Sequence, residues 1–351
     1  MSAPQIDLLL INPGSRTDIY QKLGNELSAI EPPVWAGLMA TFVRLKGYEV
    51  RILDANAEDF GPKAVAEVVQ DLNPRLVAIV VYGHNPSAST QVMPSASAIC
   101  RTLKAEQPAR KVLMLGGHVA SLPELTLQEE AADWVCGGEG LYTLCALLEG
   151  LRSGNLNVPK VPDLYYREGK EIRRTAGAPL VRELDAEMPG IAWDLLPMHL
   201  YRAHNWHCFG HTDRRQPYAS LYTTLGCPYH CTFCCIQAPF RSGEHTQGMK
   251  ETVNSYRFWS PQRIGEELEM LVNRYGIYNV KIADEMFVLT PRHVEGICDE
   301  IVRRGLKVNI WAYARVDTVR DNMVEKLKRA GINWLAFGYE AGDKRVRQDA
   351  D

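Results

Sequence analysis

Three cysteines within eight residues constrain this chain more than any other feature of its sequence. Cys227, Cys231 and Cys234 follow an apolar, β-branched run at 219–225 and a single glycine, Gly226. A run of this kind that stops at glycine and proline predicts a buried strand followed by a loop. Cysteines two or three residues apart point toward one centre, so the triplet predicts a ligand set and not a disulfide framework. Three sulfurs leave a four-ligand centre with one open position.

A structural zinc site is the alternative interpretation of these cysteines. Its candidate ligands are Cys231 and Cys234 with either Cys208 and His211 or Cys227 and Cys235. Zinc prefers a closed tetrahedron built from two separated ligand pairs, which the triplet does not supply. The 351 residues contain nine cysteines, an odd number at low density, and this count indicates a reducing compartment.

The cysteine spacing resembles the signature of the radical S-adenosylmethionine (SAM) enzymes. Three residues separate the first two cysteines, two separate the last two, and the aromatic Phe233 stands directly before the last. The resemblance implies that Cys227, Cys231 and Cys234 bind three irons of a [4Fe-4S] cluster, that SAM binds the fourth iron, and that Phe233 belongs to the cofactor site. A cluster with an open position can pass one electron to the sulfonium of SAM, which breaks a carbon–sulfur bond and gives a 5′-deoxyadenosyl radical.

Residues 1–152 alternate between apolar strand patterns and helical patterns. Strands are predicted at 6–11, 50–53, 76–82, 112–115 and 133–136, with helices between them and a closing helix that ends at 151. The alternation predicts a doubly wound α/β domain, Rossmann-like or flavodoxin-like, with about five parallel strands. Ligands of such sheets bind at the carboxyl ends of the strands, and small and polar residues follow the strands here.

Four short motifs in this half resemble those of the cobalamin-binding domain that precedes many radical SAM domains. They are Glu31-Pro32-Pro33, the turn at Asp54, Gly116-Gly117 and Gly138-Glu139-Gly140. The resemblance covers residues 1 to about 150 and implies that cobalamin is a cofactor. The residues expected to hold it lie in the loops after the strands: Ser15, Asn56, His84, Ser87, Ser89, Gly116, Gly117, His118, Gly138, Glu139 and Gly140.

Asn56 marks a departure from one type of cobalamin domain. Domains of the methionine synthase type have a histidine two residues after the aspartate, and that histidine binds cobalt from below. This chain has Asp54-Ala55-Asn56 there, so we expect no histidine of the protein on the lower face of the cobalt. His84 and His118 are expected to contact the corrin or its tail, or else to bond only the backbone of their loops. The other alternative is a domain that has lost its cofactor and serves only for packing.

Residues 153–216 are predicted to connect two domains. Prolines and charges accumulate there, and a hairpin is expected around a turn at 168–170. Residues 217–351 then show strand–helix units, with strands predicted at 219–225, 279–283, 308–315 and 334–340. Radical SAM domains usually have more such units in a partial barrel, so the resemblance implies an incomplete barrel and a truncated sequence.

Three strand ends in this half carry residues that the resemblance assigns to SAM. The family has a small acidic or glycine-rich motif after the second strand of the domain, and Asp284 and Glu285 match that position. Carboxylates suit the ammonium group of SAM; a helix-capping role is the alternative for this pair. Arg315 is expected to bind the SAM carboxylate or an anionic substrate. Glu340 matches a Gly-x-Glu-x-Gly pattern that the family has near the ribose.

The charge of the chain argues against nucleic acid as a partner. The net charge is -3 and the isoelectric point is about 6.3, without a basic stripe interleaved with aromatic residues. The N-terminus lacks a charged n-region, and the apolar run at 6–11 is too short for a signal sequence or a membrane span. We therefore expect a soluble, cytoplasmic protein whose partners are a small-molecule substrate and an electron donor such as flavodoxin or ferredoxin.

Together these features predict a cobalamin-dependent radical SAM enzyme. The deoxyadenosyl radical would abstract hydrogen from an unactivated carbon and methylcobalamin would donate a methyl group, so a C-methyltransferase is the first expectation. An oxidative cyclase is the second, because the anaerobic cyclase that acts on magnesium-protoporphyrin IX monomethyl ester has a domain order that looks the same. A non-catalytic cobalamin or redox sensor is the third.

Overall fold

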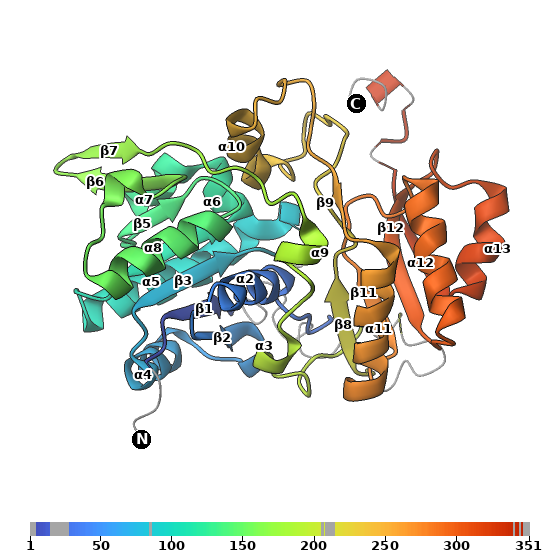
Figure 1. Cartoon of the computed structure of the whole chain (residues 1–351), viewed down its shortest axis with the longest axis horizontal. Helices are drawn as coiled ribbons and strands as arrows, with labels where there is room; N and C mark the ends of the chain where they lie inside the picture. The colour runs from blue at the N-terminus through green and yellow to red at the C-terminus, as the bar shows by residue number, and fades with distance from the viewer. Residues whose placement is uncertain are drawn as a thin grey trace.

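Two α/β parts make up the structure and lie side by side, one from each half of the chain (Figure 1). The computed structural model describes residues 5–14, 28–83, 86–204, 207, 215–339, 341–343 and 345–346. None of the helices in these ranges has the length and apolar character needed to cross a bilayer.

The first sheet has the strand order β2-β1-β3-β4-β5-β6-β7. Its parallel strands are β1 (Leu8–Asn12), β2 (Val50–Asp54), β3 (Leu76–Val81), β4 (Val112–Gly116) and β5 (Trp134–Cys136). β1, β3, β4 and β5 are buried along their whole length, as expected for parallel strands covered by helices on both faces. The predicted doubly wound sheet is confirmed.

Alternate side chains of β1 pack on two layers of helices. Leu8 and Leu10 share a core with α2 (Val34–Leu45) and α8 (Leu141–Ser153). Leu9 and Ile11 share the other core with α4 (Pro62–Leu72) and α5 (Met93–Glu106). Short helical segments follow the strand ends: α3 (Ala55–Glu58), η1 (Pro86–Val92), α6 (Gly117–Ser121) and α7 (Pro123–Glu129). The helices therefore cover both faces of the first sheet.

The hairpin expected around residues 168–170 is present and extends the first sheet. Its strands β6 (Leu164–Glu168) and β7 (Glu171–Arg174) are antiparallel, and β6 pairs with β5. The rest of the connecting segment contains η2 (Val158–Lys160), α9 (Leu184–Glu187) and η3 (Trp193–Leu195). Its apolar side chains join the same core as α2 and the helices of the second half, so this segment is packed between the two sheets.

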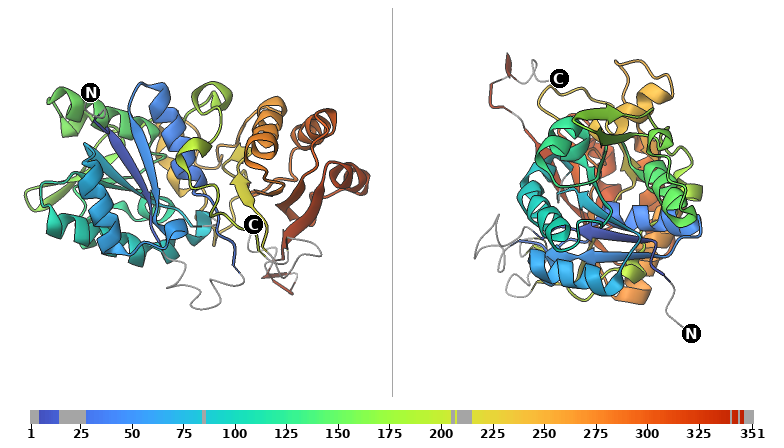
Figure 2. Two further views of the ribbon diagram at one scale, coloured as in Figure 1. Left: turned by 90° about the horizontal axis from the view of Figure 1, so that it is seen from below. Right: turned by 90° about the vertical axis from the view of Figure 1, so that its left-hand side faces the viewer.

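The second sheet has the order β13-β12-β11-β8, with all of its strands parallel. The strands are β8 (Tyr218–Leu221), β11 (Asn279–Ile282), β12 (Asn309–Arg315) and β13 (Ile332–Gly338). Helices α11 (Pro261–Tyr275), α12 (Pro291–Arg303) and α13 (Asp321–Arg329) cover one face, as the left view of Figure 2 shows. Ser220, Lys281 and Trp311 lie on the other face of the strands. The strands predicted for this half are present.

Two local features differ from the sequence expectation. The strand predicted at 219–225 is divided, because the chain turns after β8 and its last residues form β9 (Thr224–Leu225), which pairs with β10 (Arg257–Phe258) in antiparallel fashion. The helix α10 (Ala238–Thr246) is missing from the expectation, since Pro239 and Gly243 weaken its helical pattern.

Helix α11 begins with a serine cap and carries a buried acid. Ser260 Oγ accepts a hydrogen bond from Arg263 N at 3.2 Å. One turn further on, Glu267 Oε1 accepts hydrogen bonds from Ile191 N and from Trp193 Nε1, both at 2.9 Å. These bonds attach the connecting segment to α11. Burial raises the pKa of Glu267 to about 7, even though both bonds favour the carboxylate.

Replacing Glu267 with glutamine should stabilise the fold at alkaline pH. Because the folded-state pKa of about 7 exceeds the usual 4.5, this group's contribution to stability is complete below pH 4.5 and is lost as the pH rises through 7. Glutamine keeps an oxygen acceptor for Ile191 and Trp193 and cannot ionise. We expect the advantage of E267Q over wild type in free energy of unfolding to grow by about 2 kcal/mol between pH 5 and pH 8. Urea unfolding followed by tryptophan fluorescence would measure it, and an advantage independent of pH would contradict the assignment.

Candidate active site

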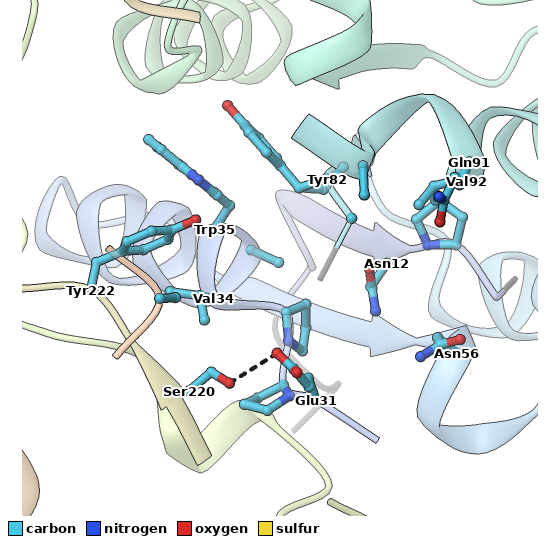
Figure 3. A pocket seen from close by; sticks show the side chains of 18 residues that line it. Asn12, Glu31, Val34, Trp35, Asn56, Tyr82, Gln91, Val92, Ser220 and Tyr222 are labelled. Carbon is cyan, nitrogen blue, oxygen red and sulfur yellow. Dashed lines mark hydrogen bonds between the residues drawn. The ribbon is translucent and has the colours of Figure 1, made fainter. Parts of the chain in front are cut away.

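A cleft lies between the carboxyl ends of the two sheets (Figure 3). Its lining includes the amides of Asn12, Asn56 and Gln91, the hydroxyl of Ser220 and the rings of Trp35, Tyr82 and Tyr222. Asn12 is the last residue of β1, whereas Asn56 lies in α3 after β2 and Gln91 lies in η1 after β3. Ser220 belongs to β8, and Tyr222 follows directly after its last residue. Trp35 and Tyr82 stack with 4.9 Å between ring centroids. Both sheets therefore direct their ligand-binding ends into one space.

Asp54, at the end of β2, shapes the floor of this cleft. Its buried carboxylate accepts hydrogen bonds from Asn12 Nδ2 at 2.7 Å, Ala57 N at 3.1 Å and Tyr201 Oη at 2.8 Å. Burial raises the pKa of Asp54 to about 6, although these hydrogen bonds favour the ionised form. Asp54 thus holds the turn, and Asn56, two residues later, lines the cleft.

The glycine pair after β4 lies beside the cleft and brings His118 near η1. Gly116 has a φ of 138°, and a Cβ there would lie 2.1 Å from Val81 O, so β4 approaches β3 too closely for a side chain. Gly117 begins α6, and His118 Nδ1 lies 3.0 Å from Thr90 Oγ1. Burial lowers the pKa of His118. His118 is not among the residues that line the cleft.

Some residues predicted for cofactor binding fall outside what the structure describes. Ser15, His84 and Glu340 lie outside the described residues, as does the side chain of Ser87. Ser89 is buried in η1 and does not line the cleft. Their assignments stay predictions.

Glu139, expected to hold cobalamin, contacts the second half of the chain. Arg257 Nη2 donates to its Oε1 at 2.7 Å, and Arg257 Nη1 and Val181 N donate to its Oε2, each at 3.3 Å. Its neighbours Gly138 and Gly140 turn the chain from β5 into α8, and Gly140 has a φ of 90°. The Gly-Glu-Gly motif therefore joins the two halves here.

The cysteine loop follows β9 and carries the three cysteines of the triplet. Cys227 is buried, Cys231 is half-buried and Cys234 is exposed. Burial raises the pKa of Cys227 to about 11. Cys227 N donates to Gln237 Oε1 at 3.1 Å. Three thiols on one partly open loop are the donor set that an iron–sulfur cluster needs.

The described part of the chain offers no compact site for a single metal ion. No three His, Cys, Asp or Glu side chains in it converge closely enough to hold one. The other zinc candidates Cys208 and His211 lie outside the described residues.

Two features fix the backbone of the cysteine loop. Asn254 Nδ2 donates to Cys227 O at 2.9 Å and to Tyr229 O at 2.6 Å. Gly226 has a φ of 87°, and a Cβ there would lie 2.2 Å from Ser255 O. A glycine therefore has to precede the first cysteine.

Gly226→Ala should lower the loading of the iron–sulfur cluster. The added methyl group would meet Ser255 O in a backbone conformation that alanine disfavours, so Cys227 must move. We expect iron and acid-labile sulfide per chain, measured after anaerobic reconstitution, to fall to roughly half or less. The matched control is Gly248→Ala, because Gly248 also has a positive φ (71°) but its Cβ would meet no atom within 4 Å. Equal loading in both variants would contradict this account of the loop.

Asp284, which follows β11, binds the backbone at the end of β8. It is fully buried and accepts hydrogen bonds from the backbone N–H and the hydroxyl of both Thr223 and Thr224. Burial raises the pKa of Asp284 to about 6. Since both carboxylate oxygens are engaged, Asp284 holds this strand end as Asp54 holds that of β2.

Glu285 lines a second, smaller cavity. The cavity is lined by Trp35, Tyr82, Tyr222, Thr224, Leu225, Gly226, Ile236, Pro239, Phe240 and Glu285. Among the described residues, nothing donates a hydrogen bond to its buried Oε1. Burial raises the pKa of Glu285 to about 8, against the attraction of Lys281. A bound ammonium group would favour the carboxylate, so Glu285 is the member of the acidic pair that is available to a ligand.

Arg315 and Phe233 lie at the outer side of the cysteine loop. The Arg315 guanidinium stacks over the ring of Tyr229, 4.3 Å from its centroid, and its Nε lies 3.1 Å from Asp317 Oδ1. Phe233 is 62% exposed. The structure therefore brings Arg315 to the loop and leaves Phe233 at the surface.

Sequence reasoning missed Lys281, which is buried in β11 with its Nζ 3.0 Å from Glu31 Oε2. A signal was available, because a lysine between the apolar residues Val280 and Ile282 of a buried strand requires a buried opposite charge.

Comparisons with known proteins agree with this geometry. A model of the B12 binding domain matches residues 20–148, and a model of the Radical SAM superfamily matches residues 221–350. An uncharacterized methyltransferase of Pyrococcus horikoshii is 28% identical over 97% of this chain and 66% of its own length. The anaerobic magnesium-protoporphyrin IX monomethyl ester cyclase of Cereibacter sphaeroides is 27% identical over 92% of this chain and 49% of its own. The radical SAM methyltransferase TsrM of Kitasatospora setae superposes with a TM-score of 0.70 at 19% identity, over 98% of this chain and 60% of that one.

The fold and the site define a two-part α/β protein in which a cysteine loop and a cofactor cleft face each other. The chain belongs to the cobalamin-dependent radical SAM enzymes, with a B12-binding domain followed by a radical SAM domain. The cofactors of this family are a [4Fe-4S] cluster, SAM and cobalamin, as the sequence predicted. The chain spans between about half and two thirds of the length of the relatives it matches.

Proposed function

We propose that this chain is the cofactor-binding part of a methyltransferase that methylates an unactivated carbon of a small-molecule substrate. The observation that carries this proposal is that the cleft and the smaller cavity share Trp35, Tyr82 and Tyr222. The floor of the B12-binding domain and the start of the cysteine loop therefore lie on either side of the same aromatic side chains. The Pyrococcus relative and TsrM, both named as methyltransferases, support the same reaction class.

The cysteine loop would hold the cluster through Cys227, Cys231 and Cys234. When bound, the cluster supplies the electron that cleaves SAM, and cobalamin supplies the methyl group. Glu285 would bind the ammonium group of SAM, since its carboxylate lies beside the loop and has an oxygen that accepts no hydrogen bond from the described residues. A charge-assisted hydrogen bond of this kind orients the ligand as well as binding it.

The cobalamin cleft would hold the corrin through amides. Asn12, Asn56 and Gln91 can each donate and accept hydrogen bonds, which matches the amide groups on the corrin rim. The stacked rings of Trp35 and Tyr82 form the wall between this floor and the cysteine loop. An aromatic wall excludes water, and excluding water protects a carbon radical from side reactions.

Glu285→Gln should weaken SAM binding without unfolding the chain. Glutamine removes the charge that pairs with the ammonium group, and Glu285 accepts no hydrogen bond through Oε1 within the described residues, so the fold loses little. We expect the dissociation constant for SAM, measured by equilibrium dialysis of the reconstituted protein, to rise about tenfold or more.

The matched control for this test is Asp284→Asn, one position earlier. Its amide would face the donors of Thr223 and Thr224, so we expect a lower midpoint of thermal unfolding. If folded D284N lost SAM while E285Q bound it as tightly as wild type, Asp284 would be the ligand and the proposal would be wrong.

The reaction class can be tested with SAM that carries a labelled methyl group. A methyltransferase should release 5′-deoxyadenosine and S-adenosylhomocysteine and transfer the label to a product, and Cys234→Ala should abolish 5′-deoxyadenosine. Cys235→Ala is the control, since Cys235 is also exposed but lies outside the triplet spacing. Formation of 5′-deoxyadenosine without label transfer would favour a cyclase-type reaction, the activity that the Cereibacter relative is named for. Absence of 5′-deoxyadenosine in wild type would favour a sensor.

An electron donor such as flavodoxin or ferredoxin would reach the cluster from the exposed side of the loop. Cys234 and Phe233 lie at the surface there, which would shorten the path for the electron. The free cysteines support a reducing compartment such as the cytoplasm.

A further inference from the structure

Two buried ion pairs join the B12-binding domain to the radical SAM domain. Glu31 Oε2 lies 3.0 Å from Lys281 Nζ, with side chains 5% and 1% exposed. Glu139 Oε1 lies 2.7 Å from Arg257 Nη2, with side chains 5% and 10% exposed. In both pairs the first half supplies the carboxylate and the second half supplies the cation. Both glutamates stand in motifs that the sequence assigned to cobalamin.

The first pair lies against the second sheet, because Lys281 belongs to its strand β11. Lys281 points from β11 toward the rings of Trp311 and Tyr313, with its Nζ 5.1 and 5.7 Å from their centroids. Glu31 Oε2 also accepts a hydrogen bond from Ser220 Oγ at 3.1 Å, which is drawn in Figure 3. Burial alone would lower the pKa of Lys281, yet the Glu31 carboxylate raises it above its usual value. Glu31 therefore bonds β8 and β11 together.

The second pair lies behind the smaller cavity. Arg257 is in β10, beside the cysteine loop, and its guanidinium stacks over Phe240, 5.1 Å from the ring centroid. Its Nη1 also donates to Val181 O at 2.6 Å, so Arg257 and Glu139 bind the connecting segment as well. Phe240 lines the cavity that Glu285 faces.

Each pair thus flanks one of the two connected cavities. Glu31 lines the cobalamin cleft, and Arg257 supports a wall of the cavity next to the cysteine loop. A buried charge that loses its partner is strongly unfavourable, and separation of the two domains would let water reach it. The pairs therefore resist one specific motion, which is the movement of the cobalamin floor away from the cysteine loop.

We propose that Glu31–Lys281 and Glu139–Arg257 are positioning residues that dock the B12-binding domain onto the radical SAM domain and fix the distance between the two cofactors. The glutamates of the Glu-Pro-Pro and Gly-Glu-Gly motifs then serve domain docking and not cobalamin binding. The docking stands on the geometry alone, whereas its effect on methyl transfer rests on the proposed function.

The first test compares Glu31→Gln with the double variant Glu31→Met/Lys281→Met in the full chain. The single change leaves the Lys281 charge buried with a neutral partner, whereas the double change removes both charges and can pack. We expect hydrogen–deuterium exchange at the end of β8 to be about tenfold faster in E31Q than in wild type, and close to wild type in the double variant. A double variant that exchanges as fast as E31Q would overturn the proposal, because the unpaired charge would not be the cause.

The control for exchange is Asp194→Asn, which breaks an exposed ion pair. Asp194 Oδ1 lies 2.9 Å from Arg44 Nη1, and both side chains are 43% exposed. This pair also joins the first domain to the connecting segment, but water already reaches it, so D194N should exchange like wild type. If hydrogen–deuterium exchange in D194N were as fast as in E31Q, the loss of any contact at this interface would have the same effect. That result would overturn the special role of the buried pairs.

The second test uses Glu139→Gln and measures cofactors and products separately. We expect the reconstituted E139Q protein to keep its iron and cobalamin content within about twofold of wild type, while the ratio of 5′-deoxyadenosine to methylated product rises about tenfold. Loss of cobalamin with unchanged exchange would assign Glu139 to the cofactor and overturn the proposal. If wild type makes no methylated product, the proposed function fails, but exchange and cobalamin content still decide the docking role.

Discussion

Both halves of this structure depend on one kind of interaction, in which a buried aspartate at the end of a parallel strand accepts backbone hydrogen bonds. Helices cover both faces of the first sheet and one face of the second, and at the strand ends the turning backbone has N–H groups without sheet partners. Asp54 accepts such a group from Ala57, and Asp284 accepts those of Thr223 and Thr224. Because both carboxyl groups are buried, their pKa values are raised to about 6 and they ionise less readily than exposed aspartates. The residues that follow, Asn56 and Glu285, are thereby directed into the space between the sheets.

This arrangement explains how one chain can bring two cofactors to one substrate. In each sheet, the ligand-binding side is formed by the carboxyl ends of the strands. The connecting segment packs against both sheets, so these strand ends face each other. The aromatic residues Trp35, Tyr82 and Tyr222 then belong to both cavities at once. A radical formed at the strand ends of one sheet would be separated from the strand ends of the other sheet only by these shared aromatic side chains. A transfer between cofactors requires this kind of geometry.

Much of the fold and part of the site follow from the sequence. The apolar strand runs, the Ser260 cap of α11 and the glycine before Cys227 are local signals, because propensity and sterics act over a few residues. The sequence also identified the acidic pair after β11, but not which member faces the ligand. That choice depends on Thr223 and Thr224, which lie 60 residues or more away in the chain. Glu139 shows the same limit of sequence-based prediction. Its partner Arg257 is 118 residues away, and no local sequence pattern predicts the ion pair.

The long separation between paired charges has a consequence for how the protein is made. Glu31 leaves the ribosome well before Lys281, its partner 250 residues later, has been translated. Until then, the nascent first half exposes the Glu31 carboxylate and an apolar surface, both of which are buried in the complete chain. The B12-binding domain can form its sheet early, but its final face is completed only when β11 emerges. The contact between the two halves is therefore completed only after the second half has been synthesised.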